Sequence, residues 1–471
     1  MPGVPLRIAL LASEVAPFSK TGGLADVSAA LAKHLTAAGH EVVTVTPLYS
    51  SIDRAAHGLS TSGGITTARL PGSPATVYFI DEPRLYDRAT LYTADPDEHL
   101  RFIRLTRAAF ELCRRLGFAP DILHCNDWHT AFGPLLLAAE YGADPLFAAA
   151  RSVLTIHNIG YQGSFDAEYA GDIGLDDLSR LHQEDLRAGH VNALKHGILY
   201  AHAVTTVSPT YAREICTEEY GMGLQETLRA RGDSLTGILN GVDYDEWDPR
   251  HDRWLPIHYD AQRLGAKAEL KRTFLAREGL PFRLGVPLAG VVSRLAEQKG
   301  IELLFDSLPP LLAARRLQLV ALGSGEARYE QFFARLARDF PQEVRFHAGY
   351  DEARAHWIEA ASDMFLMPSR YEPCGLNQMY SLRYGTVPIV RRTGGLADSV
   401  EHFDAATGRG TGIVFNDFDS AGMAWALQQA LTLHADEPAW TRLMQNGMAQ
   451  DFSWTRQSAR YVALYERVLG R

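Results

Sequence analysis

A set of charged and polar side chains stands directly after apolar runs of strand length. They are Asp127 after DILHC and Asn126, His157 after SVLTI, Arg294 and Lys299 after LAGVV and Ser293, and Glu372 in the loop after MFLM. The carboxyl ends of parallel strands meet at one edge of a sheet, and ligands bind there. Arginine and lysine together can bind a diphosphate, the first through a bidentate fork and the second as a point charge. A carboxylate in the same sheet edge can accept hydrogen bonds from sugar hydroxyls.

Each of these residues also has a structural interpretation. Arg294 and Lys299 suit a solvated turn, and Glu372 suits the N-terminus of the helix expected after it. Asp127 is either a sugar ligand, a charge stabiliser or a turn residue. A lone histidine such as His157 at a strand end is usually structural.

Two glycine loops share almost the same residues. The segment KTGGLAD begins at Lys20 after the run RIALLA, and RTGGLAD begins at Arg392 after TVPIV. Adjacent glycines let a backbone approach a ligand, and the helix expected after each loop presents unpaired N–H groups with a partial positive charge. This favours binding of an anion, most simply a phosphate. The alternative is an ordinary strand-to-helix turn, which either loop alone would fit.

Short apolar runs alternate with amphipathic segments in both halves of the chain. The expected strands include 41–46, 121–125, 152–156, 203–207, 288–292, 317–322, 344–347, 364–367 and 386–390, and the expected helices include 24–35, 100–116, 300–314, 327–340, 352–361, 376–384, 420–433 and 453–469. Residues 160–200 are expected to be an insertion of mostly helical structure, and Pro309-Pro310 to interrupt the helix from Gly300. The alternation predicts an α/β protein with two parallel sheets wound by helices, divided within 248–261.

Composition narrows the class of protein. The chain has 471 residues, 46% of them hydrophobic and 22% charged, as in a globular protein of two or three domains. Its net charge of −10, without a basic stripe, disfavours a nucleic-acid partner. The 4 cysteines are scattered without a C-x-x-C motif, which fits a reducing compartment. No apolar run approaches the roughly 18 residues of a membrane helix, so we expect a cytoplasmic protein that does not bind membranes.

Motifs of other common chemistries are missing from the sequence. Gly323-Ser324-Gly325 lacks the third glycine of a dinucleotide-binding fingerprint, and neither a P-loop nor a G-x-S-x-G elbow occurs. His124 and His129 flank Asp127 but lack the i,i+4 spacing of a metal-binding helix pair. We therefore expect no metal site.

Several motifs occur together in a characteristic order: KTGGLAD from Lys20, NDWH at 126–129, TIHN at 155–158, NGVD at 240–243, SRL at 293–295 with QKG at 298–300, and YEPCG at 371–375. In this the chain resembles the bacterial glycogen synthases and plant starch synthases, from about residue 6 to residue 468. The resemblance implies two Rossmann-like domains facing a central cleft, the GT-B glycosyltransferase architecture. Residues 1–247 would form the acceptor-side domain and 248–452 the donor-side domain, with a C-terminal helix at 453–471 crossing back to the first.

The resemblance also implies a reaction and roles for residues. The family transfers glucose from ADP-glucose to the non-reducing end of an α-1,4-glucan such as glycogen, with retention and without a metal or cofactor. Arg294 and Lys299 would neutralise the leaving diphosphate, Glu372 would hold glucose hydroxyls, and Asp127 and the His157 carbonyl would lie near the reacting sugar. The implied substrate-binding residues are Lys20, Gly22, Gly23, Tyr92 near the adenine, Asn158, Cys374, Gly375, Leu376, Thr393, Gly394 and Gly395.

Departures from related patterns are small. Many retaining relatives carry a second glutamate eight residues after the first, where this chain has Tyr380, as the synthase family does. Asn126 stands where some members have histidine. The alternatives are a related transferase that uses UDP-glucose, a catalytically silent glucan-binding protein and, less favoured, an NAD enzyme. The retained charges at 20, 127, 294, 299 and 372 argue against a silent protein.

Overall fold

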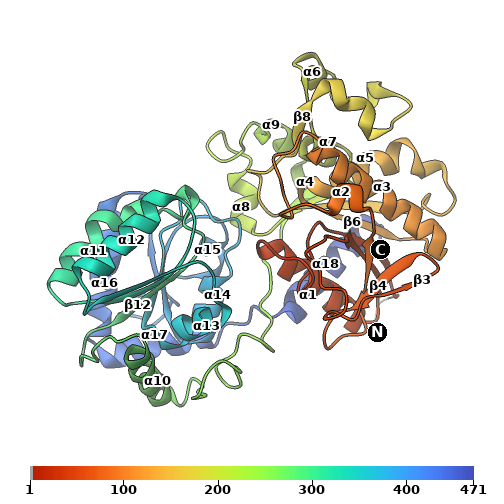
Figure 1. The fold of residues 1–471 in the computed structure, drawn as a ribbon. Helices are drawn as coiled ribbons and strands as arrows, with labels where there is room; N and C mark the ends of the chain where they lie inside the picture. The colour runs from red at the N-terminus through yellow and green to blue at the C-terminus, as the bar shows by residue number, and fades with distance from the viewer. Residues whose placement is uncertain (1–3) are drawn as a thin grey trace. The chain divides into compact units, whose positions relative to one another are not determined.

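The computed structural model describes residues 4–471, which fold into two compact units (Figure 1). Unit 1 consists of the chain up to Gly241 together with Trp454–Arg471, and unit 2 consists of Val242–Ser453. The chain therefore leaves unit 1 after Gly241, whereas we expected the division after residue 247. A Cβ atom on Gly241 would lie 2.7 Å from the Trp454 side chain, so the chain returns to unit 1 close to where it left.

Unit 1 is built on a nine-stranded sheet with the order β11-β10-β7-β6-β1-β2-β5-β4-β3. In that order the strands are Leu235–Gly237, Ala203–Thr206, Arg151–Ile156, Ile122–Asn126, Arg7–Leu11, Glu41–Pro47, Thr76–Ile80, Ile65–Arg69 and Ser60–Ser62. The strands from β11 to β5 pair in parallel, and β4 and β3 extend the sheet in antiparallel fashion. The carboxyl ends of β1, β6 and β7 are therefore neighbours at one edge, as a Rossmann-like sheet requires.

Helices cover both faces of this sheet. They are α1 (Gly23–Ala37), α2 (Pro83–Tyr86), α3 (Glu98–Leu116), α4 (Asp127–Thr130), α5 (Phe132–Ala139), α6 (Gln183–Arg187), α7 (Ala193–Tyr200), α8 (Pro209–Glu214), α9 (Gln225–Arg229) and α18 (Trp454–Val468). The C-terminal helix α18 packs beside α1 (Figure 1). It is tied to the sheet by the Tyr465 hydroxyl, which lies 2.8 Å from Nδ1 of the buried His124.

The segment 160–200 was expected to be mostly helical, and α-helix and 3-10 helix together do make up most of it, but only in short pieces. It contains the 3-10 helices η2 (Ala167–Ile173) and η3 (Leu178–Arg180), the short helices α6 and α7, and the unexpected hairpin β8 (Ser164–Asp166) and β9 (His190–Asn192). Glycines at 163, 174 and 189 have positive φ angles, which a helix cannot accommodate. These glycines divide the segment into short pieces.

Unit 2 contains a six-stranded parallel sheet with the order β14-β13-β12-β15-β16-β17. In that order the strands are Val344–Ala348, Gln318–Gly323, Leu288–Val292, Met364–Met367, Val387–Arg391 and Ile413–Phe415. The surrounding helices are α10 (Leu264–Arg277), α11 (Leu304–Ala313), α12 (Ala327–Asp339), α13 (Glu352–Ala361), α14 (Asn377–Arg383), α15 (Gly394–Ser399), α16 (Ser420–His434) and α17 (Glu437–Met448), with 3-10 turns η5 (Glu297–Lys299) and η6 (Ile301–Leu303). The strand ends of β12, β15 and β16 are again neighbours.

Two expectations for unit 2 need correction. Pro309 and Pro310 lie inside α11 and do not interrupt it. Helices α10 and α17 were not expected from the sequence. Helix α10 buries Lys267 and Lys271 together with Leu270, Phe274 and Leu275, so its apolar pattern is weak.

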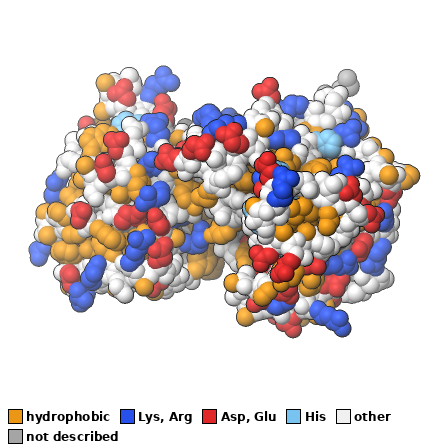
Figure 2. Space-filling model, turned by 90° about the horizontal axis from the view of Figure 1, so that it is seen from above, with side chains coloured by type: hydrophobic (Ala, Val, Ile, Leu, Met, Phe, Trp, Pro, Cys, Tyr) orange, Lys and Arg blue, Asp and Glu red, His pale blue; other side chains and the backbone are white. Residues whose placement is uncertain are grey.

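The surface and the helices give two further facts. Acidic and basic side chains are intermixed over the face drawn in Figure 2. Within residues 4–471, no helix combines the length and the apolar character needed to span a bilayer.

Candidate active site

Glu372 and Lys299 form an ion pair at the strand ends of unit 2. The ammonium Nζ of Lys299 donates to Oε2 of Glu372 at 2.7 Å, and the Ser369 hydroxyl donates to the same oxygen at 2.9 Å. Glu372 is 5% exposed. The turn after Lys299 is fixed by Gly300, where a Cβ atom would lie 2.0 Å from the Pro368 carbonyl oxygen. The two loops that carry the pair are therefore packed directly on each other.

Arg294 lies on the same loop system with an exposed side chain. Its Nη2 donates to Oε1 of Gln298 at 3.3 Å. The Gln298 side chain in turn donates to the Tyr371 carbonyl, and the Gln298 carbonyl accepts from the N–H of Arg370. The structure thus brings Arg294, Lys299 and Glu372 into one connected group of loops.

The second glycine loop is packed against the backbone of its own unit. A Cβ atom on Gly394 would lie 1.9 Å from the Glu372 carbonyl oxygen, and one on Gly395 would lie 2.0 Å from the Cys374 carbonyl oxygen. The N–H of Gly395 donates to the Glu372 carbonyl at 3.0 Å, and Thr393 is buried. These glycines serve the close approach of two protein segments.

The loop before α14 uses its carbonyl groups internally. The amide of Gln378 donates to the carbonyls of Cys374 and Gly375, and the Leu376 carbonyl accepts from the first turn of α14. Gly375 has a φ of +70°, where a side chain would be strained and would meet Gln378. The backbone of 374–376 is therefore held in one conformation beside Glu372.

In unit 1, Asp127 joins the ends of β6 and β7. Its Oδ1 accepts from the backbone N–H of His157 at 2.7 Å and of Asn158 at 3.4 Å. Asp127 has a φ of +53°, which few residues other than glycine, asparagine and aspartate adopt. Nε2 of His157 lies 2.9 Å from Oδ1 of Asn126, an oxygen that can only accept, so Nε2 carries the proton. Burial lowers the pKa of His157 to about 3, so the ring is neutral.

Burial sets the charge of Asp127. It raises the pKa of this carboxyl from 3.8 to about 7, against the two backbone hydrogen bonds and with help from the charge of Glu14. The folded protein thus holds a proton between about pH 4 and 7 that the unfolded chain releases. Because the folded pKa is raised, stability falls as pH rises through this window.

The Asp127→Asn variant is therefore expected to be more stable than the parent at pH 8, by up to about 4 kcal/mol. Asparagine tolerates the positive φ and its oxygen can still accept from His157. The measurement is the difference in urea unfolding midpoint of unit 1 between variant and parent at pH 8 and pH 4. An equal difference at both values would show that the carboxyl does not carry this penalty.

The N–H groups of the first glycine loop have an acceptor in the segment just before the loop. Glu14 is 2% exposed and lies after β1. Its Oε2 accepts from the N–H of Thr21 and, at 3.3 Å, from that of Gly22, and its Oε1 accepts from the Thr21 hydroxyl at 2.7 Å. Gly22 is extended at φ −158°, and a Cβ atom there would have no neighbour within 4 Å. Lys20 pairs with Asp26 of α1 at 2.9 Å.

Tyr92 lies beside this loop, in contact with groups of unit 1. Its hydroxyl donates to Oε1 of Glu14 and lies 2.8 Å from the Ser13 hydroxyl. Its ring stacks on His129 with a centroid distance of 4.7 Å. Burial and the charge of Glu14 raise the pKa of Tyr92 well above its ordinary value, so the hydroxyl remains a donor.

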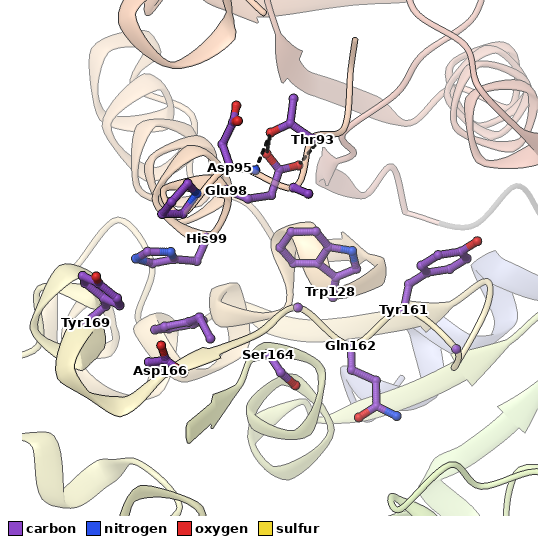
Figure 3. A pocket seen from close by; sticks show the side chains of 15 residues that line it. Thr93, Asp95, Glu98, His99, Trp128, Tyr161, Gln162, Ser164, Asp166 and Tyr169 are labelled. Carbon is purple, nitrogen blue, oxygen red and sulfur yellow. Dashed lines mark hydrogen bonds between the residues drawn. The ribbon is translucent and has the colours of Figure 1, made fainter. Parts of the chain in front are cut away.

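A pocket of about 580 Å³ opens in unit 1 next to this group (Figure 3). Aromatic side chains and carboxylates line it: His99, Trp128, Tyr161, Phe165 and Tyr169, with Asp95, Glu98 and Asp166. The backbone at Gly163 touches the Trp128 ring so closely that a Cβ atom would lie 2.1 Å from it. Asn158 forms a turn just before the lining residues 160–166, since its side chain accepts from the N–H of Gly160 at 2.9 Å.

Comparison with known proteins identifies the family. The starch synthase catalytic domain model matches residues 7–230, and the model of glycosyl transferases group 1 matches residues 274–447. A glycogen synthase of Anaeromyxobacter dehalogenans is 49% identical over 98% of this chain and 99% of its own. The chain belongs to the glycogen and starch synthase family. A second relative, the glycogen synthase of Myxococcus xanthus, is 44% identical over 98% of this chain and 99% of its own.

Solved structures agree with this membership. Starch synthase IV from Arabidopsis thaliana, solved with ADP and acarbose, has a TM-score of 0.91 and 36% identity, over 99% of this chain and 100% of that one. A sucrose-phosphate synthase from Thermosynechococcus elongatus has a TM-score of 0.62 at 18% identity, which shows the fold alone, over 98% of this chain and 99% of that one. The expected GT-B fold with two Rossmann-like domains is confirmed.

Two features of unit 1, Glu14 and the aromatic pocket, were not identified from the sequence. Glu14 was not singled out, although it follows a buried strand and precedes the glycine loop. The aromatic pocket was also missed, since Tyr161 and Tyr169 lie in the segment expected to be helical. A tyrosine next to glycines at 160 and 163 was the available signal for a loop that exposes a ring.

Proposed function

We propose that this protein is a glycogen synthase that transfers glucose from ADP-glucose to the non-reducing end of an α-1,4-glucan with retention of configuration. The observation that carries the proposal is the 49% identity to a glycogen synthase over 98% of the chain. ADP as the nucleotide is supported by the related starch synthase IV, which was solved with ADP and acarbose.

In this proposal, unit 2 holds the donor. Lys299 and Arg294 would stabilise the negative charge that develops on the departing diphosphate, which is an electrostatic contribution of the kind that dominates in many enzymes. Glu372 would accept from glucose hydroxyls through Oε1, while Oε2 remains bonded to Lys299. Backbone groups of Cys374–Leu376 would bind polar groups of the donor, and the loop Thr393–Gly395 would close on its phosphate.

We propose, from the family resemblance, that the reaction needs neither a metal nor a cofactor. The cationic side chains of Arg294 and Lys299 would supply the positive charge that a bound cation supplies elsewhere.

Retention is proposed from the family resemblance. Retaining glycosidases use a carboxylate nucleophile, but Oδ1 of Asp127 accepts from backbone N–H groups and Oε2 of Glu372 from Lys299. We propose instead that donor and acceptor react on one face of the sugar. The bond from the anomeric carbon to the phosphate oxygen breaks, the bond to the acceptor O4 forms, and the acceptor proton passes to the departing phosphate. The His157 carbonyl would lie near the anomeric carbon.

We propose that the pocket of unit 1 receives the glucan acceptor. A sugar ring offers C–H faces to aromatic side chains and hydroxyls to carboxylates, and ligand pockets combine apolar walls with a few polar groups. Figure 3 shows the rings of Trp128, Tyr161 and Tyr169 along this pocket, with the carboxylate of Asp166 among them. An extended chain of sugars fits such a lining better than a single charged ligand does.

The Tyr161→Ala variant is expected to raise the KM for a maltooligosaccharide acceptor about tenfold, with little change in donor KM. Tyr161 is 55% exposed, so its removal costs little stability. Covering one aromatic ring contributes about 1.5 kcal/mol, which is about tenfold in binding. The measurement is initial rate against maltoheptaose concentration, with Trp425→Ala on α16 as the matched control because Trp425 is 45% exposed. Equal effects of both variants would contradict the assignment of the pocket.

The proposed function is tested by transfer of labelled glucose to glycogen, with ADP-glucose and UDP-glucose assayed side by side. Transfer from ADP-glucose, with the α-linkage seen by NMR of the product, is the expected result. Transfer from UDP-glucose alone would overturn the donor. Binding of maltoheptaose without transfer from either donor would identify a silent glucan-binding protein.

A further inference from the structure

The carboxylate of Glu14 lies at the first glycine loop, where the sequence pattern predicts a ligand anion. A Gly-Gly loop at a helix N-terminus favours a negative charge, because N–H groups converge there and the helix dipole is positive. The N–H groups of Thr21 and Gly22, at the start of the 15-residue helix α1, both donate to the Glu14 carboxylate. A substrate phosphate at the same N–H groups would face this carboxylate and be repelled.

The same carboxylate holds a second segment of unit 1. The hydroxyl of Tyr92 donates to Oε1 of Glu14, so that Tyr92 is bonded to the atom that also accepts from Thr21. Tyr92 belongs to the segment 88–98, which we call the Tyr92 loop. Residues 93–96 and Glu98 of this loop line the pocket. Glu14 thus touches the glycine loop on one side and a wall of the pocket on the other.

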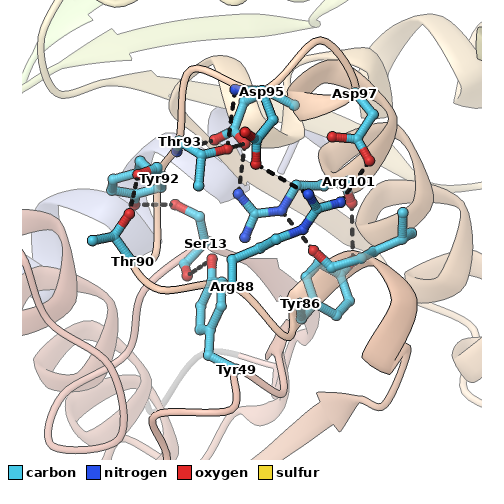
Figure 4. Close-up of polar contacts among 12 residues, drawn as sticks. Ser13, Tyr49, Tyr86, Arg88, Thr90, Tyr92, Thr93, Asp95, Asp97 and Arg101 are labelled. Atoms are coloured by element: carbon cyan, nitrogen blue, oxygen red, sulfur yellow. Dashed lines mark hydrogen bonds and ion pairs between the residues drawn. The ribbon is translucent and has the colours of Figure 1, made fainter.

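The Tyr92 loop is internally braced, so a contact at Tyr92 bears on the whole loop (Figure 4). Arg88 pairs with Asp95 at 3.0 Å and with Asp97 at 2.6 Å. The backbone N–H and hydroxyl of Thr93 donate to Glu98 at 3.1 and 2.7 Å. These bonds close the loop on itself, while the Tyr92 hydroxyl is bonded outside it to Ser13 and Glu14.

The charge of Glu14 also reaches Asp127. Burial is the main cause of the raised pKa of Asp127, and the negative charge of Glu14 raises it further. Both residues lie at the ends of neighbouring strands, β1 and β6. A change at Glu14 therefore acts on the glycine loop, on the pocket wall and on the proton of Asp127.

We propose that Glu14 is a positioning residue for glucosyl transfer: its carboxylate replaces a substrate anion at the N-terminus of α1 and fixes the Tyr92 loop, and so connects the glycine loop with the acceptor pocket. This inference rests on the proposed function for its kinetic consequences. It assigns the N–H groups of Thr21 and Gly22 to the protein's own carboxylate and not to the donor diphosphate.

The variants Glu14→Gln and Glu14→Ala distinguish the effect of the Glu14 charge from the effect of its hydrogen bonds. Glutamine retains an oxygen for the N–H groups of Thr21 and Gly22 and loses the charge, whereas alanine loses every bond. We expect Glu14→Gln to lower kcat about 10–100-fold, which is the loss expected when hydrogen bonds to a charged group are weakened. Since the family resemblance places Asp127 near the reacting sugar, we expect kcat/KM to show a pH inflection from its carboxyl, and we expect this inflection to move to lower pH in Glu14→Gln because a neighbouring negative charge is gone. Kinetics within twofold of the parent, with an unmoved inflection, would overturn the proposal.

Hydrogen–deuterium exchange gives a readout that does not require activity. Glu14→Ala is expected to accelerate amide exchange in 20–23 and in the Tyr92 loop, and Tyr92→Phe only in the Tyr92 loop. Unchanged exchange in all these segments would overturn the proposal even if the Glu14→Gln kinetics change. If Glu14→Ala does not fold, Tyr92→Phe and Glu14→Gln still decide the point.

Glu41→Gln is the control variant for these experiments. Glu41→Gln removes an exposed carboxylate at the start of β2, paired with Arg7 at 3.3 Å, and should change neither kinetics nor exchange near the pocket. If the parent protein transfers no glucose, the proposed function fails. The exchange experiments would then still decide whether Glu14 holds the two loops together.

Discussion

The Glu372→Gln variant is expected to lose about 10²–10³-fold in kcat while unit 2 remains folded, the range seen when one preorganised electrostatic group is removed. The carboxylate Oε2 accepts from Lys299 and Ser369, and glutamine can direct its oxygen to both partners. Geometry is then retained, but the charge that holds the ammonium of Lys299 in place is lost. The loss should be in kcat, because the donor's nucleotide is bound by other groups.

A matched control distinguishes this loss from general destabilisation. Asp363 also pairs with a lysine, Lys271, at 2.6 Å, and accepts from the N–H of Leu288 at the opposite ends of the strands. Burial acts to raise the pKa of Asp363, but Lys271 and His434 hold it well below its ordinary value. Asp363→Asn should therefore lower the free energy of unfolding by about 3 kcal/mol and leave kcat unchanged. Equal losses of kcat in both variants would remove Glu372 from the site.

The measurement is a comparison of kcat and of unfolding midpoint for both variants. Rapid quench of labelled glucose transfer at saturating donor reports the chemical step. Guanidinium unfolding of unit 2, followed by circular dichroism, reports the fold. A Glu372→Gln variant with parental kcat would show that the carboxylate does not act in the reaction.

The alternation of apolar runs was enough to predict the two parallel sheets. Buried parallel strands such as Leu288–Val292 and Met364–Met367 are continuous apolar runs, and the structure has them at these residues. Segments without a strong period were not predictable in this way. Helix α10 buries charged residues such as Lys271 along with apolar ones, so its pattern carries little of the helical period.

The two glycine loops show why a site cannot be read from a motif alone. Both contain TGGLAD, yet Gly22 has open space where a side chain would point, and Gly394 has the Glu372 carbonyl oxygen there. The difference depends on which segment of each unit packs against the loop. The segment that packs on Gly394 lies outside the motif, and nothing in the six shared residues specifies it.

The role of Glu14 could not be predicted from the sequence for a related reason. A carboxylate near a glycine loop is repulsive toward phosphate, so sequence reasoning directs attention to Lys20 instead. Only the fold brings Tyr92 to the same carboxylate, from a position 78 residues away. Residues that contact one another across such separations carry no local pattern.

Gly394→Ala is expected to destabilise unit 2 by more than 4 kcal/mol, and Gly22→Ala to leave the stability of unit 1 within about 0.5 kcal/mol of the parent. Gly394 has a φ of +43°, and its Cβ atom would lie 1.9 Å from a backbone oxygen that cannot move without displacing Glu372. Gly22 is extended and its Cβ atom would have no neighbour within 4 Å, so alanine fits there. Guanidinium unfolding of the two variants measures both effects.

The Gly22→Ala variant also tests whether a substrate occupies the open space next to Gly22 in the first loop. Its fold is expected to be intact, so a rise of about tenfold or more in donor KM would mean that the added methyl group displaces a ligand. Unchanged kinetics would show that the substrate does not approach Gly22, and the function of the loop would reduce to its hydrogen bonds with Glu14. Normal stability of Gly394→Ala would contradict the close packing of the second loop on the Glu372 backbone. Together the two variants test whether one motif serves a ligand in unit 1 and the packing of the protein in unit 2.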